Sequence, residues 1–195
     1  MYYPDAASRL QPLPHVPPHA QPQRSPLHGN VRLLNFQTDS SFNSSRREIR
    51  FTTGQLLHGD MKSILALDGQ AQGRVVAQLG GCDPHQLALC ARACQDAGYY
   101  EVNLNCGCPS EATQKGSFGA VLMKNPSLVA ACVRAMSDSC GIPVTVKHRL
   151  GLGYSEDYSF VRDFVGRVSD AGARVFVAHA RNAVLEGLSP RQNRR

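Results

Sequence analysis

The sequence of 195 residues contains no apolar run as long as the roughly 18 residues that a membrane-spanning helix needs, so we expect a soluble protein. No secretory apolar segment precedes its seven cysteines. Their number is odd and most of them lie in stretches of helical pattern, which argues against a disulfide framework. Free thiols in a reducing compartment fit better, and we expect the protein in the cytoplasm.

Acidic residues are scarce as well: 15 Asp and Glu stand against 21 Lys and Arg, which gives a net charge of +6 and a pI near 9.1. Basic side chains that neutralise phosphates gain free energy from counterion release. A polyanionic partner such as nucleic acid is therefore favoured, although many basic proteins bind none. With 42% hydrophobic residues, the chain has enough material for one domain with a core.

Residues 1–45 differ in composition from the rest, being rich in Pro, Gln, His and Ser. Closely spaced prolines remove backbone donors and favour an extended, unpaired chain, so we expect a disordered tail. Few acidic residues together with Arg and Ser are typical of organelle transit peptides, whereas the prolines disfavour the amphipathic helix that such peptides form. A plastid or a mitochondrion is therefore the alternative location.

Residues 46–195 alternate between short β-branched runs and helical stretches. The predicted strands are 47–54, 74–81, 99–107, 143–151 and 174–181. The predicted helices are 84–97, 126–140 and 155–171, with start signals at Asp83-Pro84, Asn125-Pro126 and Ser155. Regular alternation of strand and helix predicts an α/β fold with a parallel sheet, which is either a doubly wound sheet or a (β/α)8 barrel.

Polar residues inside these strands favour the barrel. Neighbours i and i+2 share a face of a strand, which groups Thr145 with Lys147 and Arg149, Asn103 with Asn105, and His179 with Arg181, and leaves Gln78 alone between Ala77 and Leu79. Four successive strands thus carry polar groups toward their carboxyl ends. Buried polar groups without partners are costly, so we expect a bound polar ligand at the mouth of a barrel. Alternatively, each of these polar side chains lies at a strand end and forms its hydrogen bonds with water.

Two cysteines follow the third strand, and they have different expected roles. A zinc site at Cys106 and Cys108 would need a second ligand pair, which the sequence does not offer, and a disulfide between them would be strained. Cys106 continues the apolar alternation and is expected in the core. Cys108 lies between Gly107 and Pro109, a sequence that turns the chain and projects the thiol into the cavity. It is a candidate acid or nucleophile, and the lack of an evident base favours the acid.

Six motifs occur in order along residues 78–194. They are QLGG (78–81), EVNLNCGCPS (101–110), GSFGAVLM (116–123), PVTVKHRLG (143–151) and VAHAR (177–181) with LEGLSPRQNR (185–194). Together they resemble the tRNA-dihydrouridine synthase family, in particular its members that modify positions 20 and 20a of the D-loop. The asparagine-rich strand that ends in Gly-Cys-Pro-Ser is the most specific of them.

The resemblance implies an FMN-dependent oxidoreductase with a barrel and a smaller helical domain that binds tRNA. NADPH would reduce FMN, the flavin would pass hydride to C6 of an extruded uracil, and a thiol would protonate C5 from the other face. Extrusion is required because a uridine that is stacked or paired cannot stack on the flavin. No metal is implied.

The resemblance also assigns residues. Cys108 matches the cysteine that protonates the base, and Gln78, Lys147 and His179 match the contacts to FMN. Asn105 matches a residue near the target uridine. Arg149 and Arg181 are candidate contacts to the substrate or to the flavin phosphate because of their charge and face, with a surface role as the alternative.

The family pattern is incomplete at both ends. The Pro-Met element of the family's first strand has no counterpart in VRLLNFQTD (residues 31–39), and the motifs of the last two strands and the helical domain do not follow SPRQNRR. A full barrel takes about 250 residues, so we expect a partial barrel of about five strands in a truncated or fragmentary chain. A fragment without catalytic activity that binds RNA at most, or another FMN-dependent barrel oxidoreductase, is the alternative reading.

Overall fold

The computed structural model describes residues 46–67, 74–155, 157–188 and 191–194. The expected tail over residues 1–45, including the segment 31–39, lies outside the described residues. Five strands form one sheet in the order β1 to β5, and every neighbouring pair is parallel. The strands are β1 (Arg46–Thr52), β2 (Arg74–Gly80), β3 (Glu101–Cys106), β4 (Val144–Arg149) and β5 (Phe176–His179). The five predicted strands are confirmed.

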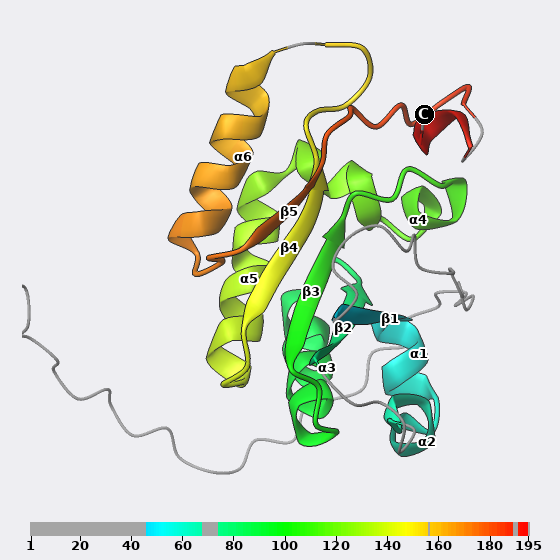
Figure 1. Cartoon of the computed structure of the whole chain (residues 1–195), viewed down its shortest axis with the longest axis vertical. Helices are drawn as coiled ribbons and strands as arrows, with labels where there is room; N and C mark the ends of the chain where they lie inside the picture. The colour runs from blue at the N-terminus through cyan, green and yellow to red at the C-terminus, as the bar shows by residue number, and fades with distance from the viewer. Residues whose placement is uncertain (1–45, 68–73, 156, 189–190, 195) are drawn as a thin grey trace, which may run out of the picture.

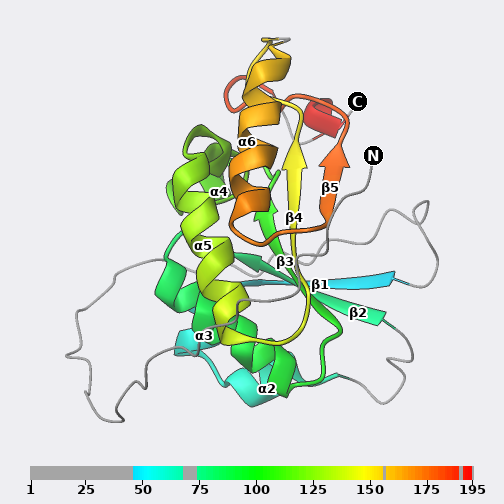
Figure 2. The same cartoon turned by 90° about the vertical axis from the view of Figure 1, so that its left-hand side faces the viewer.

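The strand order decides between the two architectures. In a doubly wound sheet the order reverses at a switch point, whereas in a (β/α)8 barrel each strand lies beside the next one in sequence. The order observed here runs without reversal, so the chain forms part of a barrel wall. In Figure 2 the arrows of β4 and β5 point to the same end of the molecule, near which α4 (Glu111–Lys115) lies.

Three helices connect the strands, close to the ranges that the sequence predicts. They are α3 (Pro84–Asp96), α5 (Pro126–Ser139) and α6 (Tyr158–Asp170). Asp83 and Asn125 cap α3 and α5 by accepting hydrogen bonds from backbone amides in the first turn, as expected. The predicted start of α6 at Ser155 is wrong. Asp157 caps this helix instead, because its carboxylate accepts the backbone N–H of Ser159 at 2.8 Å.

Several short elements were not predicted. They are α1 (Thr53–His58), α2 (Met61–Leu65), α4, and the 3-10 helices η1 (Gly119–Lys124) and η2 (Gln192–Arg194). Helix α1 begins directly after β1, so Thr53 and Gly54 are helical rather than extended. Thr52 and Gln55 form a capping box there, in which each side chain bonds the other residue's backbone N–H. That pair was the available signal for the start of α1.

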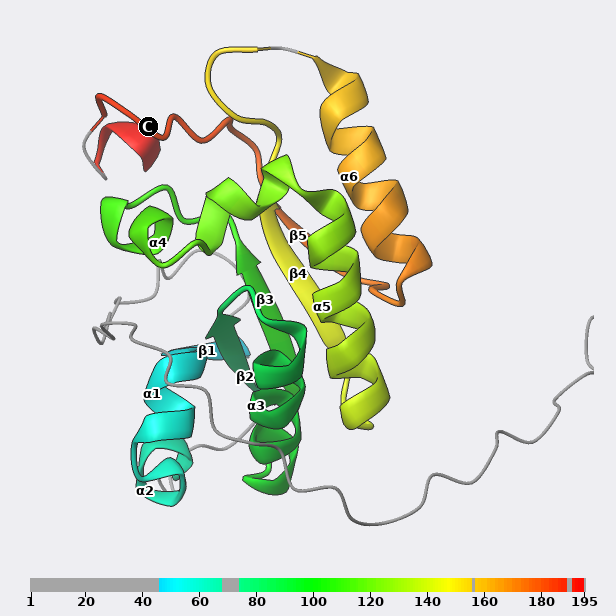
Figure 3. The same cartoon turned by 180° about the vertical axis from the view of Figure 1, so that it is seen from behind.

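The helices α3, α5 and α6 all lie on one side of the sheet (Figures 1 and 3). Apolar residues of the strands face them, among them Leu79, Leu104 and Val146, all fully buried. Cys106 belongs to the same core, as the sequence predicts. The opposite face of β2, β3 and β4 carries the polar residues, so the two faces of the sheet differ sharply in polarity.

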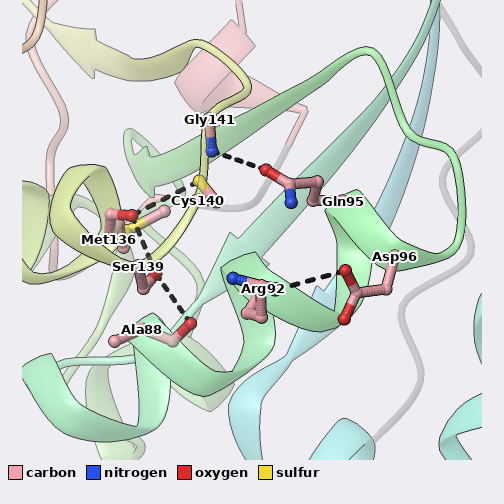
Figure 4. Close-up of polar contacts among 8 residues, drawn as sticks. All are labelled: Ala88, Arg92, Gln95, Asp96, Met136, Ser139, Cys140 and Gly141. Atoms are coloured by element: carbon pink, nitrogen blue, oxygen red, sulfur yellow. Dashed lines mark hydrogen bonds and ion pairs between the residues drawn. The ribbon is translucent and has the colours of Figure 1, made fainter.

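Hydrogen bonds between side chain and backbone fix α3 against α5 (Figure 4). The hydroxyl of Ser139, at the end of α5, donates to the carbonyl of Ala88 in α3 at 2.9 Å. The side-chain carbonyl of Gln95 accepts the backbone N–H of Gly141, which lies in the turn before β4. The ion pair of Arg92 with Asp96 on the same helix is exposed and contributes little to stability.

His148 of β4 is the polar residue that points to the helix side. It is 3% exposed, and its ring packs against Phe164 of α6 and Phe176 of β5, with centroid distances of 5.6 and 5.8 Å. Its Nδ1–H donates to the carbonyl of Arg149 at 2.7 Å. Burial lowers the pKa of His148, with the backbone bond opposing in part, so the imidazole is held neutral.

We expect the protein to lose stability on mild acidification partly through His148. An unfolded histidine titrates at about pH 6.5, so this contribution is complete above that pH and is lost as the pH falls through the lower pKa of the folded state. In His148→Leu, the decrease in the free energy of unfolding between about pH 8 and about pH 5 should be smaller than in the parent. Urea unfolding at both values measures it, and His85→Gln, on an exposed position of α3, should keep the parental decrease. An equal decrease in all three proteins would contradict the assignment.

Candidate active site

A chain of buried amides crosses the polar face of the sheet. Nε2 of Gln78 donates to Oδ1 of Asn103 at 2.8 Å, and Nδ2 of Asn103 donates to the hydroxyl of Thr145 at 2.8 Å. Thr145 in turn donates to the carboxylate of Glu101. The three strand residues are paired in register and are 1–2% exposed. Gln78, which looked isolated in the sequence, is therefore one end of a network that links β2, β3 and β4.

Asn105 extends this network to the end of β3. Its Nδ2 donates to Oε1 of Gln78 at 3.1 Å, while its Oδ1 accepts the backbone N–H of Gly107 at 3.0 Å and of Cys108 at 3.1 Å. One amide thus joins the strand β2 to the turn that carries the thiol. The position of Cys108 is set by the same side chains that cross-link the sheet.

The carbonyl of Cys108 is held from the other side. It accepts the backbone N–H of Ala120 at 2.8 Å, and at 3.1 Å it shares the single hydroxyl proton of Thr113 with the carbonyl of Ser110, which lies at 2.7 Å. Gly119 has φ = 78°, and a Cβ at this position would lie 2.5 Å from the Cys108 carbonyl oxygen. Glycine is therefore required for this close approach. The Cys108 thiol is half-buried and lies 3.5 Å from the hydroxyl of Ser110.

Two of the other cysteines, Cys90 and Cys106, are fully buried in the core. All seven are free thiols. Burial raises the pKa of Cys106, with Cys132 adding to the effect, and burial raises the pKa of Cys90 to about 12. These two thiols stay protonated and pack as small apolar residues. Among the described residues, no three or more His, Cys, Asp or Glu side chains are grouped to hold a metal ion.

Cationic groups gather at the carboxyl ends of β4 and β5. Arg149 is paired in register with His179, and Lys147 with Asn105 of the neighbouring strand. The pKa of His179 is lowered by burial first, and then by the charges of Arg149, Lys147 and Arg181. A neutral imidazole therefore stands among three cations, which is a setting for an anionic ligand.

Arg149 is buried, which excludes the surface role that was its alternative. It is 4% exposed, and burial lowers its pKa, with Cys108 raising and Arg181 lowering it. Nε donates to the carbonyl of Gly107 at 3.0 Å, and Nη1 donates to the carbonyls of Asn193 at 2.9 Å and Asn182 at 3.4 Å. Within the described part of the chain, Nη2 donates no hydrogen bond. Arg181 is exposed, so the surface reading of that residue stays open.

The structure thus brings the predicted residues of β2 to β5 to one end of the sheet. Sequence reasoning missed Thr113, which holds the Cys108 carbonyl, and Glu101, which receives the hydrogen bond of Thr145. The alternation that grouped Asn103 with Asn105 also places Glu101 on their face, so this residue was detectable. Thr113 carried no such signal, because it belongs to a short helix whose position depends on tertiary contacts.

We expect the charge of Lys147 to hold down the pKa of His179. Replacing the lysine by glutamine removes one of the three cations and should raise that pKa toward the ordinary value. An NMR titration of the imidazole C–H resonances measures the change. Lys115→Gln, which alters an exposed lysine of α4 that is not among the charges acting on His179, is the control and should leave the titration unchanged. A decrease in the pKa of His179 in Lys147→Gln would contradict the arrangement.

Comparisons with known proteins match most of the described residues. Residues 51–195 match the family model described as dihydrouridine synthase (Dus). The tRNA-dihydrouridine(20/20a) synthase of Pseudomonas aeruginosa is 53% identical over 143 residues, which cover 73% of this chain and 43% of that protein. Its namesakes in Synechocystis and Salmonella typhi are 50% and 49% identical, over 73% of this chain and 42% and 43% of theirs.

The chain spans less than half the length of these curated relatives. The matched region runs from the end of β1 to the last residue and contains the amide network, Cys108 and the cationic group. Since the family model covers most of the sequence, the chain belongs to the dihydrouridine synthase family.

Proposed function

We propose that this chain carries the core of an active site that reduces uridine to 5,6-dihydrouridine in the D-loop of tRNA, with FMN as the cofactor and NADPH as the reductant. The observation that supports the proposal most directly is the fixation of Cys108. Its backbone is bonded on both sides, to Asn105 through N–H and to Ala120 and Thr113 through the carbonyl, at the end of a strand beside a cationic group. Preorganisation of this kind is typical of a group that acts at one defined atom.

The residues present fit a flavin phosphate and its ring. When bound, FMN supplies the hydride that is transferred to the base. Lys147 would hold the negative charge of the reduced ring, and Gln78 and His179 would supply further polar contacts from β2 and β5. The lowered pKa of His179 keeps its imidazole neutral, so that it both donates and accepts. The surrounding cations suit an anionic cofactor.

Cys108 would act as the general acid. Hydride arrives at C6 of the uracil and the thiol gives its proton to C5, so one two-electron reduction and one proton saturate the C5–C6 bond. The thiolate left behind would be stabilised by Arg149, whose guanidinium interacts with Cys108 electrostatically, until a proton from solvent restores the thiol.

Contacts to the RNA substrate would fall to three residues, Asn105, Arg149 and Arg181. The side-chain oxygen of Asn105 accepts from the backbone of Gly107 and Cys108, and one proton of its side-chain nitrogen is donated to Gln78. The second proton of that nitrogen would be donated to the base. Arg149 has its Nη2 group available among the described contacts, and the exposed Arg181 would contact RNA phosphates. The uridine must leave its stack to reach this site.

A second candidate is a chain that binds RNA through its net charge of +6 without catalysis. A different FMN-dependent oxidoreductase of the barrel class is the weaker alternative, since it gives no reason for the asparagine network that ends at Cys108.

The first experiment is a flavin spectrum. The purified chain, mixed with FMN and separated from free flavin, should retain absorbance at about 450 nm. Lys147→Gln should lower the retained fraction because it removes a charge that would hold the flavin, whereas Lys115→Gln on α4 should not. Salt-sensitive tRNA binding without any retained flavin would favour the non-catalytic candidate.

The second experiment tests the acid. We expect Cys108→Ala to lower the yield of dihydrouridine in an unmodified tRNA transcript by about a hundredfold or more, because general acids contribute on that scale. Mass spectrometry of digested tRNA measures the product. Cys140→Ala, which removes another half-buried thiol at the C-cap of α5, before β4 begins, is the matched control and should keep activity. Equal yields from Cys108→Ala and the parent would refute the assignment.

A further inference from the structure

The turn that carries the thiol is joined to a segment far away in sequence. We define the cysteine loop as Gly107–Ser110 and the exit loop as residues 182–188, which follow β5. Two side chains bridge these loops, and each donates only to backbone carbonyls. Nε2 of Gln114 donates to Pro109 at 3.0 Å and to Leu185 at 2.7 Å, while Arg149 donates to Gly107 and to Asn182.

The exit loop is itself held in place on two sides. The side-chain amide of Asn193 pairs with the backbone of Val184 in both directions, at 3.0 Å each, and the carbonyl of Asn193 accepts from Arg149. Asn193 is 5% exposed. On the other side, Ala183 forms a parallel bridge with Leu152. The exit loop is therefore fixed by hydrogen bonds to two other segments of the chain.

Helix α4, by contrast, has only five residues and depends on tertiary contacts for its stability. Its place is set by Thr113, which bonds the cysteine loop, and by Gln114, which bonds both loops. Both protons of the Gln114 amide nitrogen are used in this way, and both acceptors are carbonyl oxygens. Neither a carboxylate nor a thioether at this position could supply the two donors.

From these contacts we infer that Gln114 is a positioning residue for Cys108, acting together with Arg149 to hold the cysteine loop against the exit loop. The inference rests on the proposed function in that it assumes Cys108 to be the working thiol. We call this pair of bridging side chains, Gln114 and Arg149, the clamp. The clamp would fix the position of the Cys108 thiol relative to the carboxyl ends of β3 and β4. Gln114 itself touches neither base nor flavin in this role.

The test measures thiol reactivity and does not require activity. Gln114→Met keeps the length and the neutral charge of the side chain and removes both donors. In the intact chain, each cysteine is alkylated with iodoacetamide and its rate is followed by peptide mass spectrometry. The half-buried Cys82 and Cys140 serve as internal references. We expect the rate at Cys108 to rise about fivefold, which corresponds to the loss of one ordinary hydrogen bond, with both references unchanged.

Gln95→Met is the matched control. Gln95 also joins two segments through a bond to backbone, from α3 to Gly141 in the turn before β4 (Figure 4), and among the described residues no hydrogen bond links it to the cysteine loop. It should leave the Cys108 rate at the parental value. An unchanged Cys108 rate in Gln114→Met would overturn the inference, and so would an equal rise at all three thiols, because that would indicate general loosening.

The outcome is separable from that of the proposed function. If Cys108→Ala still forms dihydrouridine while Gln114→Met accelerates alkylation of Cys108 selectively, the clamp exists but the thiol is not the acid. If activity depends on Cys108 and its alkylation does not respond to Gln114→Met, the proposed function stands and the positioning role is refuted.

Discussion

The structure depends on one constraint, which is that the polar face of a parallel sheet must satisfy its own hydrogen bonds. Parallel strands are normally buried on both faces and apolar on both. Here Gln78, Asn103 and Thr145 are almost fully buried, and each amide or hydroxyl finds its partner on a neighbouring strand because the register places the three side by side. A slip of one residue between β2 and β3 would leave these groups unpaired and would bring apolar side chains to the polar face.

The same network explains how a site can be built at the strand ends without a long loop. Asn105 continues the row of amides and turns it into a holder for the backbone of Cys108, and Thr113 and Ala120 complete the holder from the following segment. The thiol is therefore positioned by bonds to its main chain. Its sulfur is half-buried, and its one hydrogen-bond contact within the described part of the chain is the hydroxyl of Ser110. Cys106, only two residues earlier, is fully buried on the opposite face.

The sequence predicted the elements that have a strong period and missed those that depend on tertiary contacts. Five strands and three long helices were predictable from alternation and from the caps at Asp83 and Asn125. The start of α6 was misplaced because Ser155 and Asp157 both resemble caps, and only the geometry shows which carboxylate or hydroxyl bonds the first turn. The grouping of Asn105, Lys147, Arg149 and His179 followed from the i, i+2 rule. Gln114 and Asn193 lay beyond it, since their partners are backbone carbonyls in segments of no fixed period.

The bond from Arg149 to Asn193 has a consequence for the order in which the molecule is made. Asn193 lies 44 positions after Arg149 and 85 positions after Cys108, so a ribosome synthesises the guanidinium and the thiol well before this acceptor. The amide network of β2, β3 and β4 lies wholly before Arg149 in the chain and can form earlier. In a nascent chain the central strands can therefore pair before the backbone support behind Cys108 has been made.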